Sequence, residues 1–368
     1  MKKYILTLLL IIVIPLFVIS CDSTDNDDSN NVSVRQPIVK QYGDLSIHFL
    51  ELGNRYTGDC VYIKYKNIDI VIDAGSKQTS AATITEYINM YIQDNKLEYV
   101  IATHGHEDHI AGFYSTSTVK GVLETYEIGT IIDFPRTNST SATYNHYQTA
   151  RANAVARGAV HFNALQCYRE EIEGAKRIFD LGDDVKLEIL YNYYYENPSV
   201  NNENNYSVCV RIIQGERQYL FTGDLEKDAE DRLVDYYQDN YGGLGHAVLY
   251  KGGHHGSNTS SNEKLMEEIK PEYVCVCSCV GTSQYTFYNP NNVFPSQGFI
   301  NRVAPYTDKI YITTLITDYQ NNIFTSFNGD IVFLVSDDKI SVICSNNDDI
   351  LKDTEWFKNN RTLPDAWK

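Results

Sequence analysis

The sequence predicts an α/β fold in which two β-sheets pack face to face and helices cover their outer surfaces. Three observations predict it. Strand-like segments outnumber helical ones, both ends of the globular body contribute strands, and clusters of histidine and aspartate directly follow apolar strands. Loops after strand ends are where α/β folds usually place their chemistry.

The first half of the body reads as three strands, a helix and a fourth strand. Short apolar runs bounded by Gly, Asn and Asp are typical of strands, and apolar residues at helical spacing are typical of helices. In order these segments are LSIHFLEL, CVYIKY, IDIVIDAG, SAATITEYINMYIQDN and EYVIATH. The last of them leads into THGHEDHIAG, residues 103–112.

The second half alternates strands and helices in a similar way. The expected strands are VKLEILYNYY, YSVCVRII, RQYLFTGD, HAVLYKGG, YVCVCSCV, KIYITTL, IVFLVS and KISVIC, and the expected helices are LEKDAEDRLVDYYQDN and NEKLMEEIK. One strand ends at Asp224 and another at the pair His254 and His255. Both ends are therefore candidate site positions.

The N-terminal residues have the composition of an export signal. Two lysines precede an apolar run from Tyr4 to Ile19, which is short for a membrane span of about 20 residues and is interrupted by Pro15. The tetrapeptide ending at Cys21 resembles a bacterial lipobox, in which that cysteine carries lipid. We expect a protein held outside the cytoplasmic membrane by acyl chains on Cys21. A secreted protein without lipid is the alternative.

These features predict four parts of the chain. They are a lipoprotein signal peptide over 1–20, a polar tether over 21–42, a globular domain over 43–345 and a C-terminal tail over 346–368. The tether sequence DSTDNDDSNN is polar and charged, as solvated linkers are.

Charge and cysteine content exclude several classes of protein. The net charge is −17, and loss of Lys2 and Lys3 with the signal would make it more negative. Proteins that bind DNA or RNA normally show a basic footprint, so nucleic acid is a disfavoured partner. The cysteines after Cys21 are odd in number and lack C-x-x-C spacing, which favours neither a disulfide framework nor a zinc ribbon. The alternating thiols of YVCVCSCV read as buried small side chains on one strand face.

Three histidines and an aspartate within six residues predict a metal site. His104 and His106 lie two apart on an extended segment and can hold one ion, and Asp108 and His109 can reach a second. Imidazole is the commonest side-chain metal ligand, and catalytic zinc sites combine it with carboxylates and an open position. A pair of ions needs a bridging carboxylate, and Asp224 is the candidate.

The pair His254 and His255 offers the last ligand of the second ion. The order H-x-H-x-D-H, T-G-D and G-H-H-G-S is a far more specific signal than a lone H-x-H. These motifs make the chain similar to the metallo-β-lactamase fold, and within it to the competence-type (ComEC-like) extracellular hydrolase branch. TGDCVYIKYKNIDIVIDAG, ENNYSVCVRI, FPSQGFINRV and FNGDIVFLVSDD extend the resemblance from about Gly43 to Cys344.

The resemblance implies a four-layer αββα sandwich of two mixed sheets, with a hydrolase domain over 43–345. It also implies two zinc ions, with manganese or iron as alternatives for such ligands. The implied ligands are His104, His106, Asp108, His109, Asp224 and His255. His255 is favoured because other members of the fold place their ligand in a G-H-G turn, and His254 would then bind a substrate oxyanion. The reverse assignment stays open.

Supporting roles are expected for several other side chains. Asp73 either orients a ligand histidine or caps the turn before Gly75, and Asp59 is a second candidate for outer support. Ser257 and Thr259 are expected to cap the following helix. Many members of the fold have a further histidine ligand, for which this chain offers only His146 and His161, and both read more simply as surface residues. Phe294 stands where the branch often has a histidine.

The resemblance implies an extracytoplasmic phosphodiesterase in which hydroxide held between the ions attacks phosphorus. Asp108, Asp224 and His254 would be its catalytic residues. The acidic charge favours a small or polymeric wall or lipid phosphodiester, such as a phosphorylcholine ester, over nucleic acid. Two alternatives remain: hydrolysis of a lactam, lactone or thioester at the same site, and a surface binding protein that has lost catalysis.

Overall fold

The computed structural model describes residues 38, 45–53, 56–198, 201–277, 293–318, 323–336 and 339–368. The predicted signal peptide, its Cys21 and nearly all of the predicted tether lie outside these ranges, as does Cys279. Residues Pro37–Lys368 form one compact unit. Within the described ranges, we find no helix with the length and apolar character needed to span a membrane.

The first sheet has eight strands in the order β17-β16-β1-β2-β3-β4-β5-β6. Strands β3 to β6 run parallel and the other pairs are antiparallel, so the sheet is mixed. The strands are β1 (Leu45–Phe49), β2 (Val61–Tyr65), β3 (Ile68–Ile72), β4 (Lys96–Ile101), β5 (Glu127–Asp133), β6 (Val160–Asn163), β16 (Ile331–Val335) and β17 (Ile340–Cys344).

The second sheet has seven strands in the order β13-β12-β11-β10-β9-β8-β7 and is also mixed, because β10 to β13 are parallel and β7 to β10 antiparallel. Its strands are β7 (Ile178–Gly182), β8 (Val185–Ile189), β9 (Val210–Gln214), β10 (Arg217–Phe221), β11 (Leu249–Lys251), β12 (Tyr273–Val276) and β13 (Ile310–Ile312). A separate hairpin joins β14 (Thr314–Asp318) to β15 (Ile323–Ser326).

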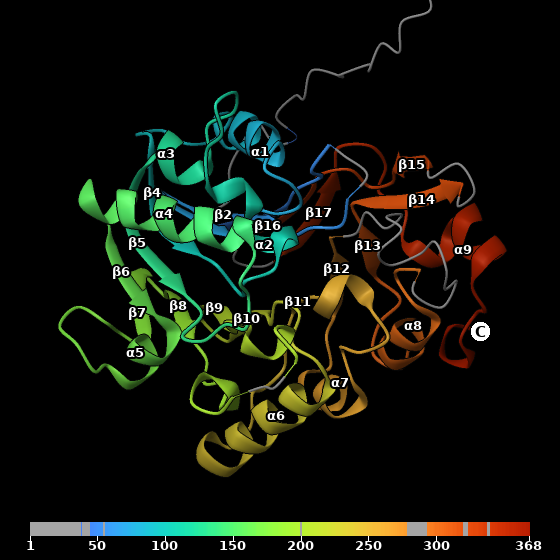
Figure 1. Cartoon of the computed structure of the whole chain (residues 1–368). Helices are drawn as coiled ribbons and strands as arrows, with labels where there is room; N and C mark the ends of the chain where they lie inside the picture. The colour runs from blue at the N-terminus through green and yellow to red at the C-terminus, as the bar shows by residue number, and fades with distance from the viewer. Residues whose placement is uncertain are drawn as a thin grey trace, which may run out of the picture. The chain divides into compact units, whose positions relative to one another are not determined.

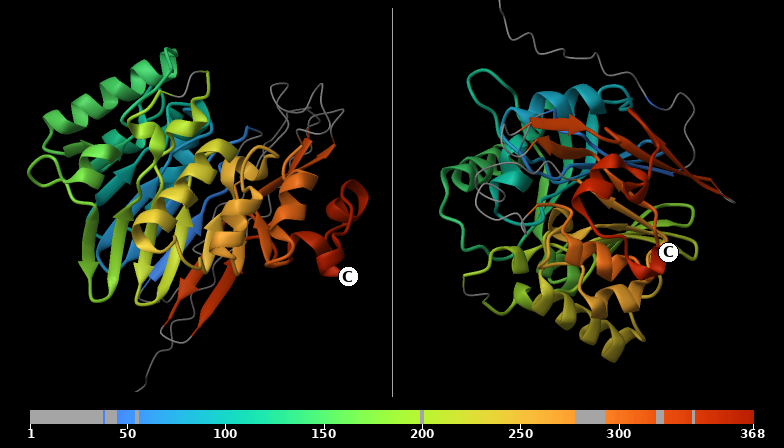
Figure 2. Two further views of the ribbon diagram at one scale, coloured as in Figure 1. Left: turned by 90° about the horizontal axis from the view of Figure 1, so that it is seen from below. Right: turned by 90° about the vertical axis from the view of Figure 1, so that its right-hand side faces the viewer.

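Helices lie on the outer side of each sheet (Figure 1, Figure 2). The helices over the first sheet are α1 (Ser80–Ile88), α2 (Glu107–Ile110), α3 (Val122–Thr125) and α4 (Ala142–Ala156). Those over the second sheet include α6 (Lys227–Tyr241), α7 (Glu263–Ile269) and α8 (Gln297–Val303). The shorter α5 (Ala164–Arg169) and α9 (Glu355–Asn360) lie at the edges of the body. The order of layers is helices, sheet, sheet, helices.

Aromatic side chains join the two sheets in the middle. Phe49 of β1 lies 6.3 Å between ring centroids from Phe221 of β10 and 5.8 Å from Phe333 of β16. On the other face of β1, Nδ1 of His48 lies 2.8 Å from the hydroxyl of Tyr87 in α1. Every residue of β1 is therefore buried, as expected for a strand covered on both faces, and each large apolar side chain contributes about 1.5–3 kcal/mol.

The predicted fold class is confirmed, and the differences lie in elements with weak sequence signals. Helix α4 was not predicted, because it buries only Tyr147, Ala150 and Ala154 and has little apolar periodicity. Strand β6 was not predicted either, since Val160 is exposed and the strand has only four residues. The predicted strand VKLEILYNYY ends at Ile189, after which the tyrosines form a turn of 3-10 helix at Tyr193–Tyr195.

The C-terminal tail packs on the body. Trp356 and Phe357 of α9 join the apolar cluster that lies between the second sheet and its helices. The Trp367 ring lies 5.8 Å from that of Phe357, and its indole N–H donates to the carbonyl of Thr307 at 3.2 Å.

Candidate metal centre

The candidate side chains stand in loops that follow four strands. Strands β3 and β4 are parallel neighbours in the first sheet, and β10 and β11 are parallel neighbours in the second. Parallel neighbours bring their carboxyl ends to the same edge of a sheet. Asp73 follows β3, the histidine cluster follows β4, Asp224 follows β10 and the histidine pair follows β11. Each sheet therefore supplies part of the site.

The backbone of these loops is held in uncommon conformations. Asp73, His254 and His255 have φ angles of 59°, 46° and 53°, in the left-handed region that residues other than glycine seldom adopt. Backbone strain of this kind costs about 1–3 kcal/mol and concentrates at functional sites. A Cβ on Gly75 would lie 1.5 Å from the carbonyl oxygen of Asp108, so only glycine allows the β3 loop to meet the histidine loop.

Asp224 lies at the centre of the cluster. Its Oδ2 is 3.0 Å from Nε2 of His109 and 3.2 Å from Nε2 of His255. The same His255 nitrogen lies 3.5 Å from Oδ2 of Asp108. Asp224, His109 and His255 are completely buried, so the carboxylate is enclosed by imidazole nitrogens.

His104 and His106 complete a continuous set. Nε2 of His104 lies 3.0 Å from Nδ1 of His106, and the His104 ring lies 4.1 Å between centroids from that of His109. The structure thus brings together all of the ligand positions inferred from the sequence, which are His104, His106, Asp108, His109, Asp224 and His255.

Asp73 makes the contacts of an orienting residue rather than those of a turn cap. Its Oδ2 lies 2.8 Å from Nδ1 of His109, on the side of the ring opposite Asp224. Thr103 donates its backbone N–H to Oδ1 of Asp73 and its hydroxyl to Oδ2, both at 2.7 Å. The His109 ring is therefore fixed from both nitrogens.

Asp59 supports His255, and a residue that the sequence did not reveal supports Asp59. Nδ1 of His255 lies 3.0 Å from the backbone carbonyl oxygen of Cys277 and 3.1 Å from Oδ1 of Asp59. The Lys251 ammonium forms an ion pair with the same carboxylate and lies 3.7 Å from Oδ1 of Asp224. Asp59 is within ligand reach of the cluster, but this pairing gives it a partner other than a metal ion. The only indication of this role in the sequence is that Lys251 stands in the otherwise apolar run HAVLYKGG.

The motif ENNYS fixes the loop that carries Asp224. The Ser207 hydroxyl accepts the backbone N–H of Asp224 at 3.1 Å, and Oδ1 of Asn205 accepts that of Glu226 at 3.3 Å. Asn204 donates its side-chain amide to Glu226 at 2.9 Å. These contacts explain why the polar motif precedes a buried strand.

His254 lies beside the cluster, and its ring is held by a hydroxyl. Its Nε2 lies 3.8 Å from Oδ2 of Asp224, and its Nδ1 lies 3.0 Å from the hydroxyl of Thr259. The expectation that Ser257 and Thr259 cap the following helix is wrong, because the residue at that helix start is Asn262. The Ser257 hydroxyl instead lies 3.2 Å from that of Thr259.

The two remaining histidine candidates contact other parts of the body. The His146 ring stacks on Tyr114 with centroids 5.0 Å apart, and Nε2 of His161 lies 2.8 Å from Oδ1 of Asp133. The Phe294 ring lies 6.1 Å from that of His254, so an apolar side chain borders the cluster there.

Burial and neighbouring charges set the protonation of the cluster. Burial lowers the pKa of His104, and the neighbouring imidazoles lower it further, so this ring is neutral and offers lone pairs. Burial by itself would raise the pKa of Asp224, but the surrounding histidines hold it well below its usual value. Burial lowers the pKa of His109 and His255, yet the Asp224 carboxylate raises both well above the usual value. Metal ligands must be deprotonated, so a cation that binds here would release protons.

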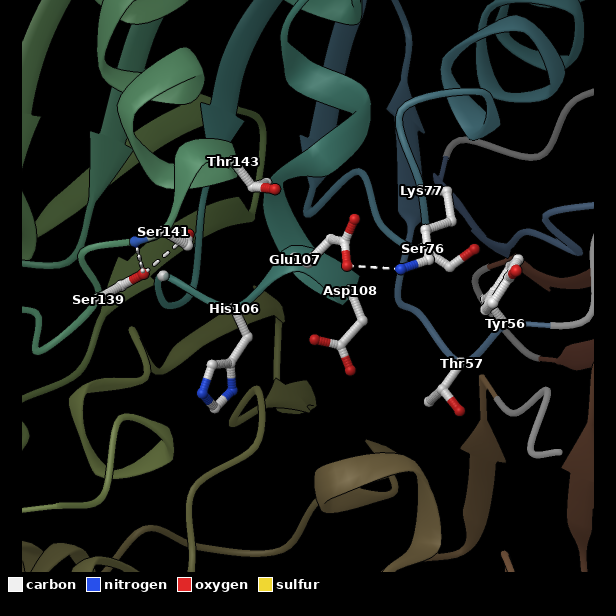
Figure 3. A pocket seen from close by; sticks show the side chains of 11 residues that line it. Tyr56, Thr57, Ser76, Lys77, His106, Glu107, Asp108, Ser139, Ser141 and Thr143 are labelled. Atoms are coloured by element: carbon white, nitrogen blue, oxygen red, sulfur yellow. Dashed lines mark hydrogen bonds and ion pairs between the residues drawn. The ribbon is translucent and has the colours of Figure 1, made fainter. Parts of the chain in front are cut away.

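A polar cavity of about 250 Å³ opens over His106 and Asp108. Figure 3 shows Ser139, Ser141 and Thr143 on one side of it and Tyr56, Thr57, Ser76 and Lys77 on the other. Since residues of the candidate metal centre form part of its wall, a molecule in this cavity would contact them directly.

Part of the chain is similar in sequence to known proteins. Residues 53–122, which contain the first histidine cluster, match the model of the Metallo-beta-lactamase superfamily. The chain is 33% identical over 115 residues to Competence protein ComA of Neisseria gonorrhoeae and 31% identical over 113 residues to ComE operon protein 3 of Bacillus subtilis. These matches cover 31% and 29% of this chain but only 15% and 13% of the two relatives.

Among solved structures, the metallo-beta-lactamase fold protein YhfI of Bacillus subtilis aligns with a TM-score of 0.40 and 11% identity, over 73% of this chain and 95% of that one. The match to the superfamily model and the two mixed sheets agree with the metallo-β-lactamase fold. A buried cluster of histidine and aspartate in this fold indicates a metal-dependent hydrolase.

Proposed function

We propose that this protein, which has the metallo-β-lactamase fold, is a phosphodiesterase with two metal ions that acts outside the cytoplasmic membrane, anchored by lipid on Cys21. The observation that carries the proposal is the position of Asp224, whose Oδ2 lies within 3.2 Å of the Nε2 atoms of His109 and His255. The centroid of the His104 ring lies 4.1 Å from that of the His109 ring, so this carboxylate is close to the ligands proposed for both ions, and a pair of ions requires such a shared carboxylate. The similarity to two competence proteins supports assigning the chain to that hydrolase branch.

The donor set fits metal ions. Oδ1 of Asp224 and Nε2 of His255 are buried and have no hydrogen-bond partner among the described residues. Such unsatisfied polar atoms cost about 1–3 kcal/mol each, which a bound cation would offset. Imidazole and carboxylate suit zinc, and manganese and iron also accept them.

Each ion would be held by side chains from both sheets. His104 and His106 would hold one ion, Asp108, His109 and His255 the other, and Asp224 both. Ions bound in this way lower the pKa of water toward neutrality and stabilise charge on the attacking and leaving oxygens of a phosphodiester.

The protein's own side chains orient the ligands and the substrate. Asp73 contacts Nδ1 of His109, and the Cys277 carbonyl together with Asp59 contacts Nδ1 of His255, which directs both Nε2 atoms toward the cluster. Because Thr259 engages Nδ1 of His254, Nε2 of that ring is left to donate to a phosphoryl oxygen. The Asp108 side chain is 15% exposed and that of His254 is 11% exposed, so these two residues can meet a substrate.

The choice of phosphodiester follows from charge. The net charge of −17 opposes a long nucleic acid. An anchored enzyme would meet wall and lipid phosphodiesters at the membrane surface, and these are the substrates that we propose.

Metal content and turnover of bis(p-nitrophenyl) phosphate, measured on the same purified protein, test the proposal. We expect two ions per chain and hydrolysis that His104→Ala abolishes. His146→Ala is the matched control, because this histidine contacts Tyr114 outside the cluster. Two ions with turnover of a chromogenic lactam but not of the phosphodiester would replace the proposal with carbonyl hydrolysis, and absence of bound metal would reject both.

A further inference from the structure

We infer that the phosphodiester carries a small, uncharged polyol, of glycerol to monosaccharide size, and that this alcohol occupies the cavity over His106 and Asp108. The inference rests on the proposed phosphodiesterase activity and names the substrate class. It is drawn from the size of the cavity, the hydroxyl groups of its walls and the ion pair between Lys77 and Glu107.

The cavity is small and adjoins the metal centre. Its volume is about 250 Å³, below the usual range of about 300–1,000 Å³ for small-molecule sites. Besides residues 105–108, three segments form the walls: the loop with Tyr56 and Thr57, the loop after β3 with Ser76 and Lys77, and residues 139–143, which include the start of α4 (Figure 3). Only a compact substituent fits between them.

Hydroxyl groups dominate these walls. The Ser139 and Ser141 hydroxyls lie 3.1 Å apart, and Ser141 also accepts the backbone N–H of Tyr144 at 3.1 Å. The hydroxyl of Thr143 has no hydrogen-bond partner within the described part of the chain, although the residue lines the cavity. Hydroxyls both donate and accept, so this surface complements an alcohol with several hydroxyls of its own.

Apart from the proposed metal ligands His106 and Asp108, the charged residues of the cavity pair with each other. Lys77 Nζ lies 2.5 Å from Oε2 of Glu107, which leaves no net charge from this pair. The Lys77 ammonium also lies 4.7 Å from the centroid of the Tyr56 ring. A quaternary ammonium group such as choline binds on aromatic faces, but this face already has a cation over it. The cavity therefore disfavours a cationic headgroup.

A second cavity borders the first, and no lysine or arginine is among the described residues that line it. It has a volume of about 440 Å³ and shares His106, Ser139 and Ser141 with the first. Its one carboxylate, Glu203, accepts from the backbone N–H of Gly105 at 3.0 Å and from the Thr137 hydroxyl at 2.6 Å. Two adjoining cavities that share the proposed metal ligand His106 can take the two alcohols of a diester.

These walls differ from those of a nucleic-acid channel. Single-stranded nucleic acid is held by a positive groove and by aromatic faces on which bases stack. Among the described residues that line the two cavities, the only lysine is paired and the only tyrosine is covered. A polyol phosphodiester is the class that remains.

Four p-nitrophenyl phosphodiesters test the inference on the metal-loaded protein: the glyceryl, propyl, choline and thymidine esters. The propyl ester has the length of the glyceryl ester without its hydroxyls. We expect the glyceryl ester to have the highest kcat/KM, at least about fivefold above the propyl ester, which corresponds to one or more hydrogen bonds.

Thr143→Val locates the effect in the cavity, because it removes the hydroxyl and keeps the shape. We expect a severalfold higher KM for the glyceryl ester and a severalfold smaller ratio of kcat/KM between the glyceryl and propyl esters. Thr149→Val is the matched control on the same helix, since Thr149 is exposed and its hydroxyl donates to the carbonyl of Asn145.

The outcomes separate the inference from the function on which it rests. Turnover of the propyl ester with no gain for the glyceryl ester, or a preference for the choline or thymidine ester, would overturn the inference alone. Failure of all four esters, together with bis(p-nitrophenyl) phosphate, would overturn the proposed phosphodiesterase and the inference with it.

Discussion

The ammonium of Lys251 lies 3.7 Å from Oδ1 of Asp224 and forms an ion pair with Asp59, and all three side chains are buried. Burial by itself would lower the pKa of Lys251, but the two carboxylates raise it well above its usual value, so the residue is a permanent cation. Its charge offsets part of the negative charge that Asp59, Asp73, Asp108 and Asp224 concentrate at one edge of the sandwich.

Lys251→Met is expected to destabilise the metal-free protein by about 3–5 kcal/mol, because it leaves the Asp59 carboxylate buried without its cation. Urea unfolding measures the change. Adding Asp59→Asn to this variant is expected to restore part of the lost stability, because it removes the buried carboxylate charge. Lys66→Met is the control, since Lys66 is exposed and pairs with Asp183 at the surface. Equal destabilisation by both lysine substitutions would contradict the role given to the buried pair.

Asp224→Ala and His106→Ala are each expected to abolish turnover while the body stays folded. Asp224 contacts His109 and His255, two proposed ligands of one ion, and His106 contacts His104, a proposed ligand of the other, so metal content is expected to fall below two ions per chain. Elemental analysis and circular dichroism on the same samples measure the two properties. Activity that is unchanged in either variant would reject the binuclear mechanism.

Thr259→Val is expected to lower kcat about tenfold and to leave metal content unchanged. The hydroxyl of Thr259 lies 3.0 Å from Nδ1 of His254 and fixes the ring that would meet the phosphoryl oxygens. Thr259→Ser keeps the hydroxyl and is expected to retain most of the rate. If the valine and serine variants lose activity equally, the effect comes from packing and not from orientation of the ring.

Glu230 is expected to make stability fall as pH rises. Burial raises its pKa from 4.5 to about 7, although Ser261 and Asn262 donate to it. Between these two values the folded state keeps a proton that the unfolded state releases, so stability decreases across this window by about 3 kcal/mol and is flat above it.

Thermal unfolding from pH 4.5 to pH 8 checks this expectation against Glu230→Gln, which cannot ionise. As pH rises from 4.5 to about 7, the melting temperature of the unsubstituted protein is expected to fall relative to that of the Glu230→Gln variant. A difference that stays constant with pH would show that Glu230 does not titrate there.

The ligand positions could be predicted because the residue types that bind metal are visible in short stretches of sequence and because these stretches follow strands. Histidine and aspartate at strand ends are conspicuous in the sequence, and parallel neighbours bring such ends together. This reasoning reached His104, His106, Asp108, His109 and Asp224, and the resemblance to the fold favoured His255 over His254.

Other parts depend on contacts across the fold that no local pattern encodes. Lys251 acts through Asp59, which lies far away in the sequence, and a lysine in a strand usually indicates a solvated face. Thr259 could equally cap a helix, and Asn262 takes that place instead. Helix α4 buries mainly alanine on its inner face, so its amphipathic signal is weak, yet it supplies Thr143 to the cavity.

The left-handed backbone at His254 and His255 has a consequence for the protein's persistence in its compartment. Two strained residues in sequence are held by surrounding contacts, including the backbone N–H of His254, which donates to the carbonyl of Gly223 at 3.3 Å. Bound ions would tie this loop to the opposite sheet and favour the folded state by mass action. Where the metal is scarce, we therefore expect the loop to open and be cut by proteases, so the amount of the protein, as well as its activity, would follow the supply of metal.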